Sequence, residues 1–300
     1  MIEGSNLKFD NLISASSMAE VRKIELRSRK TVNTSMAGQY RSAFRGTGLV
    51  FSDIREYMPG DDVKHIHWKV TARSGKVYIK SYEEDRELNV VIALDVSSST
   101  AAGSLKSKHQ RGLEFCGIIS MLAKLSQDSL GLCLFSDDVD EFLPVSKSRS
   151  QFKRVLLELL KERTLKPSTN LAAALSHLSK NLKKTSVVFV ISDFYAPSYV
   201  DELRLLSLKH DVIAVMLEDQ LDYDLPNAGL VEFRDAESGE FILIDCSNKK
   251  LREQLSRVHN TRIAKWKDDC KKSGCDYLEI RESPLKALSQ LMQRRNQRLR

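Results

Sequence analysis

The stretch Asn89-Val90-Val91-Ile92-Ala93-Leu94-Asp95-Val96-Ser97-Ser98-Ser99 decides the fold class of this chain. Residues 90–94 are apolar without alternation, which is typical of a β-strand that is covered on both faces. Strands of this kind occur in parallel sheets flanked by helices. Because such sheets bind ligands at the carboxyl ends of their strands, the polar residues that follow Leu94 form the first candidate site.

Beyond this strand, short apolar strands alternate with amphipathic helices. Further strands are expected at 130–135, 139–145, 186–191, 212–217 and 277–280. Helices fit 109–126, 150–163, 170–183, 199–209, 249–272 and a closing segment from Pro284, and 229–245 fits an inserted β-hairpin. The first of these helices repeats apolar residues at Phe115, Ile118, Ile119, Leu122 and Leu125. The order predicts an open, doubly wound, mostly parallel α/β sheet over residues 89–300.

The first 88 residues differ in character from the rest. Residues 15–30 have a helical pattern, whereas 46–86 are rich in strand and turn signals, including Met58-Pro59-Gly60-Asp61-Asp62. We therefore expect residues 1–88 to form a helix and a small β-rich module packed beside a larger domain at 89–300.

Composition excludes several classes of protein. The chain has 300 residues, of which 42% are hydrophobic and 29% charged, so it is neither disordered nor collagen-like. Five cysteines without a C-x-x-C pair argue against a disulfide framework and a zinc ribbon. No signal peptide is evident, and the apolar runs fall far short of the ~20 residues that a membrane span needs. These features predict a cytoplasmic protein.

The net charge of +7 is unevenly distributed. Residues 1–88 carry 15 basic and 12 acidic groups, and residues 246–300 carry 15 and 6, which leaves −5 for residues 89–245. An acidic centre suits a cation site. The basic C-terminal segment is more typical of a solvated helix face than of a nucleic-acid surface, because no aromatic residues are interleaved with it. Nucleic acid is therefore not expected as a partner.

Three loops supply oxygen-bearing side chains at one edge of the predicted sheet. The D-x-S-x-S sequence offers Asp95, Ser97 and Ser99; Ser168-Thr169-Asn170 precedes a helix and offers Thr169; and Ile191-Ser192-Asp193 ends a core strand and offers Asp193. Carboxylate and hydroxyl oxygens are hard ligands that suit Mg²⁺ or Mn²⁺. The competing interpretation is that these residues only cap helices and turns, without a metal.

This combination resembles the metal-ion-dependent adhesion site of the von Willebrand factor A fold, and the element order of 89–300 resembles that fold too. By this resemblance Ser97 and Ser99 would bind the ion directly. Asp95 and Asp193 would bind mostly through water, and Thr169 directly or through water. One coordination position would remain for a carboxylate of a partner protein.

The chain also resembles a bacterial family known as domain of unknown function 58. The resemblance is carried by Arg45-Gly46-Thr47-Gly48, by Arg55-Glu56-Tyr57-Met58-Pro59-Gly60-Asp61-Asp62, and by Trp68 with Thr71-Ala72-Arg73. His67 and Thr100 depart from the family pattern, and neither belongs to the five residues of the proposed adhesion site. Membership would imply an adaptor or chaperone-like partner of a MoxR-type AAA+ ATPase.

Two other chemistries compete with a non-enzymatic, metal-dependent interaction module. The main alternative is a Mg²⁺-dependent phosphoesterase or phosphotransferase using Asp95 or Asp193, although no nucleophile with a neighbouring base stands out. The second alternative is a further metal site at His65-x-His67, which requires that these residues lie on a strand. No P-loop motif occurs, so nucleotide hydrolysis by that mechanism is not expected.

Overall fold

The structure is a computed structural model that describes residues 28, 30, 32, 34–44, 50–83, 87–101, 107–148, 150–164, 166–234 and 240–298. These residues form two compact units, one comprising residues up to 43 together with 89–300, and the other residues 44–88. Most of the helix expected at 15–30 lies outside the described residues.

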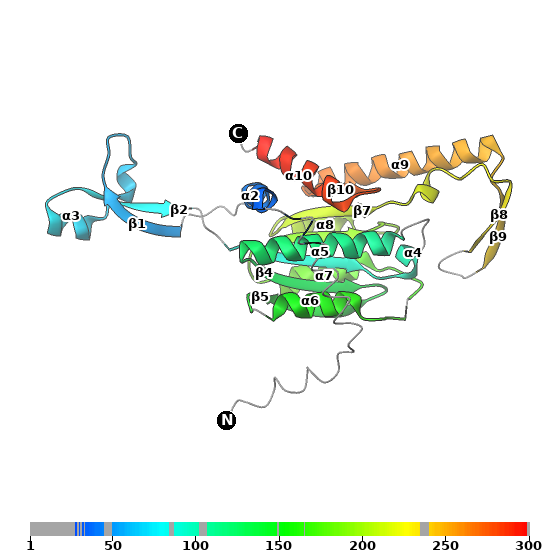
Figure 1. The fold of residues 1–300 in the computed structure, drawn as a ribbon, viewed down its shortest axis with the longest axis horizontal. Coiled ribbons are helices and arrows are strands. Elements are labelled where there is room, and N and C mark those ends of the chain that lie inside the picture. The colour runs from blue at the N-terminus through cyan, green and yellow to red at the C-terminus, as the bar shows by residue number, and fades with distance from the viewer. Residues whose placement is uncertain are drawn as a thin grey trace, which may run out of the picture. The chain divides into compact units, whose positions relative to one another are not determined.

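The larger unit is built on a six-stranded sheet (Figure 1). Its strand order is β10-β7-β6-β3-β4-β5. The strands are β3 (Asn89–Asp95), β4 (Ser129–Phe135), β5 (Val139–Ser146), β6 (Val187–Ser192), β7 (Asp211–Leu217) and β10 (Asp276–Ile280). Every neighbouring pair is parallel except β4 and β5, which meet as an antiparallel pair at one edge. The predicted open, mostly parallel α/β sheet is confirmed.

Helices cover both faces of this sheet, as expected for strands that are apolar without alternation. On one side α5 (Lys108–Ser126) packs with α6 (Gln151–Leu160), α10 (Pro284–Arg298) and α2 (Thr34–Ala43). On the other side α7 (Leu171–Asn181), α8 (Val200–Ser207) and α9 (Lys249–Ser273) share one apolar core with alternate residues of the strands. None of the helices in the described part of the chain is both long and apolar enough to cross a membrane.

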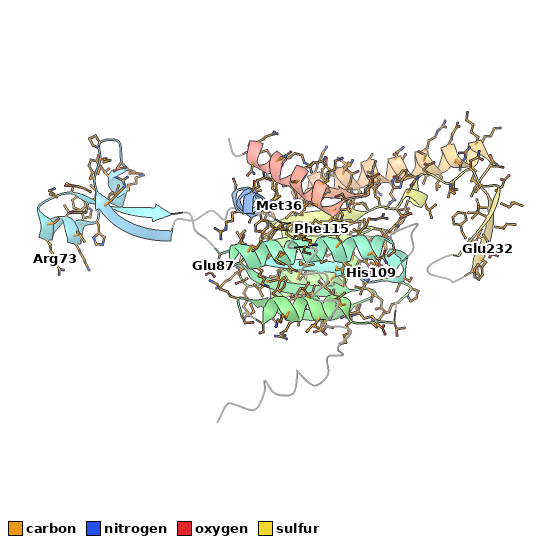
Figure 2. The ribbon with its side chains drawn as sticks, viewed as in Figure 1. Met36, Arg73, Glu87, His109, Phe115 and Glu232 are labelled. Carbon is orange, nitrogen blue, oxygen red and sulfur yellow. The ribbon has the colours of Figure 1, made fainter. Side chains whose placement is uncertain are left out.

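Helix α5 is held against the sheet by the apolar side chains of its inner face. Phe115, labelled in Figure 2, meets Phe189 of β6 edge to face with ring centroids 5.7 Å apart. Phe115, Ile118, Ile119 and Leu122 are all buried, as their spacing predicts, whereas Leu125 is 46% exposed. The helix ends just beyond it at Gln127, whose left-handed backbone (φ 58°) caps the last turn.

Helix α2 was not predicted from the sequence. It belongs with the larger unit, where it packs against α5 and α10. Met36 and Tyr40, one turn apart, are both buried. The described residues before 44 therefore group with the sheet domain, not with the residues that follow them.

The smaller unit contains an antiparallel strand pair, β1 (Val50–Glu56) and β2 (Tyr78–Glu83), with the 3₁₀ turn η1 (Val63–His65) and the helix α3 (Trp68–Ser74) between them. Arg55 donates two hydrogen bonds, of 2.8 and 2.6 Å, to Asp61, and this guanidinium lowers the pKa of the Asp61 carboxyl. Asp61 also accepts a hydrogen bond from the Met58 backbone, so the carboxylate closes the predicted turn.

A last inserted element is the hairpin of β8 (Leu230–Arg234) and β9 (Phe241–Asp245), which matches the expected position. A short helix, α4 (Ser98–Ala101), follows β3, and a 3₁₀ turn, η2 (Gln220–Asp222), follows β7. Both lie beyond the carboxyl ends of their strands, where the candidate site is located.

Candidate metal centre

The candidate site is set by the pairing of β3 with β6. Leu94 lies beside Ile191 in this parallel pair, so the residues that follow them, Asp95 and Ser192, emerge at the same edge of the sheet. Asp193 comes next on the second chain segment. The two predicted carboxylates therefore reach one edge because the strands are parallel neighbours.

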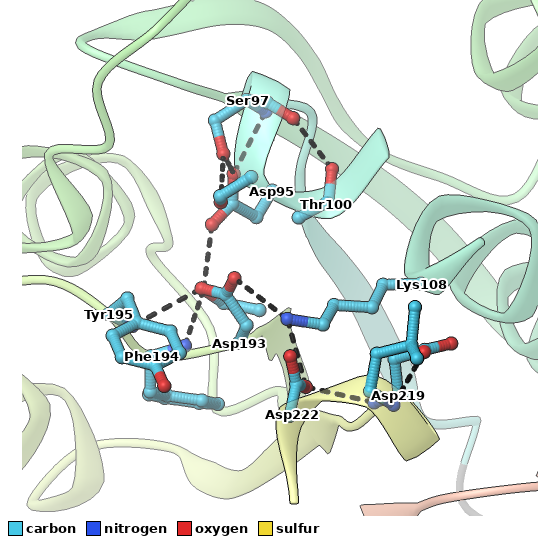
Figure 3. Close-up of polar contacts among 12 residues, drawn as sticks. Asp95, Ser97, Thr100, Lys108, Asp193, Phe194, Tyr195, Asp219 and Asp222 are labelled. Carbon is cyan, nitrogen blue, oxygen red and sulfur yellow. Dashed lines mark hydrogen bonds and ion pairs between the residues drawn. The ribbon is translucent and has the colours of Figure 1, made fainter. Parts of the chain in front are cut away.

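Asp95 organises the loop that follows β3 (Figure 3). Its Oδ1 accepts hydrogen bonds from the backbone N of Ser97 (3.0 Å) and from Ser97 Oγ (2.6 Å). The hydroxyl oxygens of Ser97 and Ser99 lie 3.1 Å apart. Thr100, within α4, donates its Oγ1 hydrogen to the Ser97 carbonyl oxygen at 2.7 Å. The D-x-S-x-S segment thus gathers one carboxylate and two hydroxyls within hydrogen-bond distance of each other.

The Asp95 carboxyl is fully buried, and burial raises its pKa to about 6. The hydrogen bonds from Ser97 and Ser192 offset part of this rise, whereas the nearby negative charge of Asp193 adds to it. Within the described part of the chain no basic side chain forms an ion pair with Asp95. Its negative charge is therefore stabilised by neutral donors alone, which compensate a buried charge poorly.

Asp193 is only 1% exposed and lies at a strained turn. Its Oδ1 accepts a hydrogen bond from the Tyr195 backbone at 3.2 Å, and its own carbonyl oxygen accepts one from Arg262 of α9. Phe194 adopts a left-handed backbone conformation (φ 54°), and its ring packs on Trp266 with centroids 5.4 Å apart. The aromatic core thereby fixes a turn that a non-glycine residue adopts at a cost.

A lysine that the sequence did not single out faces this carboxylate. Lys108 begins α5, and its side chain is only 6% exposed. Its Nζ lies 3.6 Å from Asp193 Oδ2 and 3.0 Å from Asp222 Oδ2 of η2 (Figure 3). Asp222 Oδ2 also accepts the Asp219 backbone N–H at 2.9 Å. No local pattern signals this contact, because Lys108 precedes its partners by more than eighty residues.

Ser192 is the second residue that was missed. Its Oγ donates to Asp95 Oδ2 at 2.7 Å and accepts from the Phe194 backbone at 3.0 Å. A serine directly before Asp193 at a strand end was the available signal. The hydroxyl holds the two carboxylate-bearing loops together.

The loop of Thr169 lies beside the loop of Ser97, but its side chain is not joined to the others. The Ser98 backbone donates to the Lys166 carbonyl oxygen at 2.9 Å, and the Asn170 backbone donates to the Ser136 carbonyl oxygen at 2.6 Å. Asn170 caps α7 by accepting from the Ala173 backbone. Among the described residues, no hydrogen bond connects Thr169 with Asp95, Ser97, Ser99 or Asp193. Hydrogen bonds thus join Asp95, Ser97 and Ser99 directly, and the neighbouring Ser192 links Asp193 to them, whereas Thr169 is linked to the site only through the backbone of its loop.

The donor set fits a hard divalent ion. The described residues contain no group of three or more His, Cys, Asp and Glu side chains of the kind that holds a metal. This site has only two carboxylates, so hydroxyls would have to complete it, as the sequence predicts. Asp193 Oδ2 and the Ser98 hydroxyl are buried without a hydrogen-bond partner in the described part of the chain. An oxygen left in this state is available to a cation or its water.

The histidine pair is not arranged as a strand. His65 ends the 3₁₀ turn η1, which Asp62 caps, and His67 caps α3 by accepting the Val70 N–H at 3.4 Å. The expectation that the two histidines lie on a strand is therefore wrong. The cause is turn chemistry: Asp62 satisfies the backbone of a tight turn in place of a strand partner.

Several uncharacterized proteins are similar to this chain. One from Mycobacterium bovis and two from strains of Mycobacterium tuberculosis are each 27% identical over 274 residues, which covers 88% of this chain and 84% of each relative.

Solved structures resemble the chain at low scores. An aerotolerance-related membrane protein from Bacteroides fragilis has a TM-score of 0.47 at 17% identity, and the conserved hypothetical protein BatB from Bacteroides thetaiotaomicron has 0.44 at 18%. Each match covers 70% of this chain and 99% of the other. These scores support no conclusion about function.

The family is shown by a different comparison. A family model matches residues 53–264, more than half of the chain, and this stretch includes Asp95, Ser97, Ser99, Thr169 and Asp193. The chain therefore belongs to the family described as protein of unknown function DUF58.

Proposed function

We propose that this chain is a non-enzymatic protein-interaction module that binds a carboxylate of a partner protein through a divalent ion, Mg²⁺ or Mn²⁺. The observation that carries the proposal is the pair of buried carboxylates, Asp95 and Asp193, beside the hydroxyls of the Ser97 loop. Buried carboxylates need a compensating cation, and hard oxygens prefer a hard one.

Each residue of the site has a role in this proposal. The hydroxyls of Ser97 and Ser99 would bind the ion directly, and Asp95 and Asp193 would bind mainly through water that the ion holds. Thr169 would contribute from the neighbouring loop. With few carboxylates bound directly, the ion keeps much of its positive charge, and a partner carboxylate gains strongly from meeting it.

The alternative, a Mg²⁺-dependent phosphoesterase or phosphotransferase, requires a free carboxylate as nucleophile or base. Both oxygens of Asp95 already accept hydrogen bonds, and Asp193 faces the ammonium of Lys108. This arrangement favours the interaction module over the enzyme.

The partner that we propose is a MoxR-type AAA+ ATPase, with this chain acting as an adaptor or chaperone-like component in the cytoplasm. This part of the proposal depends on the family resemblance. It requires neither a membrane span nor a nucleic-acid partner.

Binding measurements test the proposal. Calorimetric titration with Mn²⁺ should give a saturable isotherm for the wild type, which Asp95→Ala abolishes and Asp201→Ala, an exposed acid on α8, leaves unchanged. The purified ATPase should bind the wild type in Mg²⁺ and not in EDTA. Equal binding by the wild type and Asp95→Ala in both buffers would contradict the proposal, and Mg²⁺-dependent hydrolysis of p-nitrophenyl phosphate that Asp95→Ala abolishes would support the enzyme.

A further inference from the structure

Lys108 is held in place mainly by Asp222, not by the candidate site. Its Nζ is 3.0 Å from Asp222 Oδ2 and 3.6 Å from Asp193 Oδ2. Asp222 is itself fixed, because its Oδ2 accepts the Asp219 backbone N–H within the capping box of η2. Ser107 caps the first turn of α5 and so fixes the backbone next to Lys108. The ammonium is therefore anchored on one side and shared with the site on the other.

Asp193 Oδ2 is the oxygen that a divalent ion at the proposed site would need, directly or through its water. Its sister oxygen Oδ1 already accepts the Tyr195 N–H, whereas Oδ2 has no hydrogen-bond partner in the described part of the chain and faces the ammonium at ion-pair distance. A divalent ion that approaches Asp193 through a bound water is repelled by the ammonium of Lys108, which already lies beside this carboxylate. Because both groups are buried, this repulsion is weakly screened.

We propose that Lys108 is a tethered cation that competes with the divalent ion for Asp193, so that the ion binds weakly until a partner carboxylate adds negative charge. This inference rests on the proposed function and deepens it, because it names a residue that sets the affinity of the metal. It also gives a reason why Lys108 is buried beside Asp193, although removing its ammonium from water costs free energy.

The competition predicts that substitutions of Lys108 and of Asp222 change the affinity for Mn²⁺ in opposite directions. Lys108→Gln removes the competing charge, and we expect Mn²⁺ to bind about tenfold more tightly. Asp222→Asn removes the second carboxylate that Lys108 contacts, so the ammonium should interact more strongly with Asp193. Mn²⁺ should therefore bind this variant more weakly than the wild type. A purely structural role of Lys108 would weaken Mn²⁺ binding in both variants.

The test is calorimetric titration of the full chain with Mn²⁺ alone. Lys108→Arg, which keeps the charge, should bind like the wild type, and Lys180→Gln, an exposed lysine on α7, is the remote control. The effect of Lys108→Gln should persist between about 0.15 and about 0.5 M NaCl, because salt screens buried charges little. Asp222→Asn keeps the proposal testable if Lys108→Gln does not fold.

The outcomes separate the two proposals. If the wild type binds Mn²⁺ and Asp95→Ala does not, but Lys108→Gln binds with unchanged or lower affinity, the metal site stands and the competition is refuted. Tighter binding by Lys108→Arg, or unweakened binding by Asp222→Asn, also refutes it. If neither the wild type nor Lys108→Gln binds Mn²⁺, both proposals fall.

Discussion

Ser192 Oγ donates a 2.7 Å hydrogen bond to Asp95 Oδ2 and so joins the ends of β6 and β3. The same hydroxyl accepts the N–H of Phe194, whose backbone is left-handed. One buried hydroxyl therefore supports both the carboxylate of one loop and the strained turn of the other. The geometry of the site depends on this residue, although it is not a proposed ligand.

Replacing Ser192 by alanine should destabilise the chain by about 1–3 kcal/mol, because it leaves a buried carboxylate oxygen and a buried backbone N–H each without this partner. Urea unfolding measures the loss. The control is Ser207→Ala, since Ser207 Oγ donates to the Leu203 carbonyl within α8. Equal losses in the free energy of unfolding of the two variants would show that the bond to Asp95 stabilises the chain no more than an ordinary hydrogen bond within a helix.

The raised pKa of Asp95, about 6 against the ordinary 3.8, predicts a specific dependence of stability on pH. Because the folded chain binds this proton more tightly than the unfolded chain, the free energy of unfolding falls as pH rises from 3.8 to about 6. In EDTA, Asp95→Asn should match the wild type near pH 4 and exceed it by up to about 3 kcal/mol near pH 7.5.

Urea unfolding of both proteins at several pH values provides the measurement. Mg²⁺ should stabilise the wild type at the higher pH, where Asp95 is ionised, and should not stabilise Asp95→Asn. A difference between the two proteins that does not change with pH would show that the burial of Asp95 costs the folded state nothing.

The sheet and most of the candidate site could be predicted because their signals are local. The apolar run at 90–94 and the polar residues after it mark a buried strand and its carboxyl end, and Ser192-Asp193 repeat that pattern on the neighbouring strand. Parallel pairing then brings Asp95 and Asp193 to one edge.

The residues that could not be predicted depend on contacts between distant parts of the chain. The first residue of a helix shows no periodicity that marks it as buried, so Lys108 was passed over, and its partners come from the loops after β6 and β7. Thr169 stays a prediction, because the sequence places its loop but does not determine which way its hydroxyl points. For the same reason α2 was missed, because packing on α5 and α10 stabilises a short helix of weak pattern.

The α5 helix offers a test of how burial, not sequence pattern, determines stability. Leu122 is fully buried and Leu125 is 46% exposed, although both belong to the apolar repeat. Leu122→Ala should cost about 2–5 kcal/mol because it opens a cavity, whereas Leu125→Ala should cost about 0.5 kcal/mol or less. Urea unfolding curves of the two variants compare the costs, and similar midpoints would mean that α5 packs differently from this structure.

Arg111 and Asp219 form a buried ion pair that connects α5 with the end of β7. Arg111 Nη2 lies 2.6 Å from Asp219 Oδ2, with side chains that are 8% and 1% exposed. Asp219 Oδ1 accepts the Leu221 N–H and so begins η2, which carries Asp222. The pair therefore supports the element that anchors Lys108.

Arg111→Met removes the guanidinium from beside a buried carboxylate, so it should destabilise the chain by about 3–5 kcal/mol. The double variant Arg111→Met/Asp219→Asn should lose less than the sum of the two single losses, because the two side chains interact directly and the double variant removes both charges. Lys272→Met is the control: Lys272 pairs with Asp268 at the same 2.6 Å, but both side chains are exposed, and no loss should be measurable. Additive losses in the double-mutant cycle would show that Arg111 stabilises α5 through packing of its alkyl chain and not through its charge.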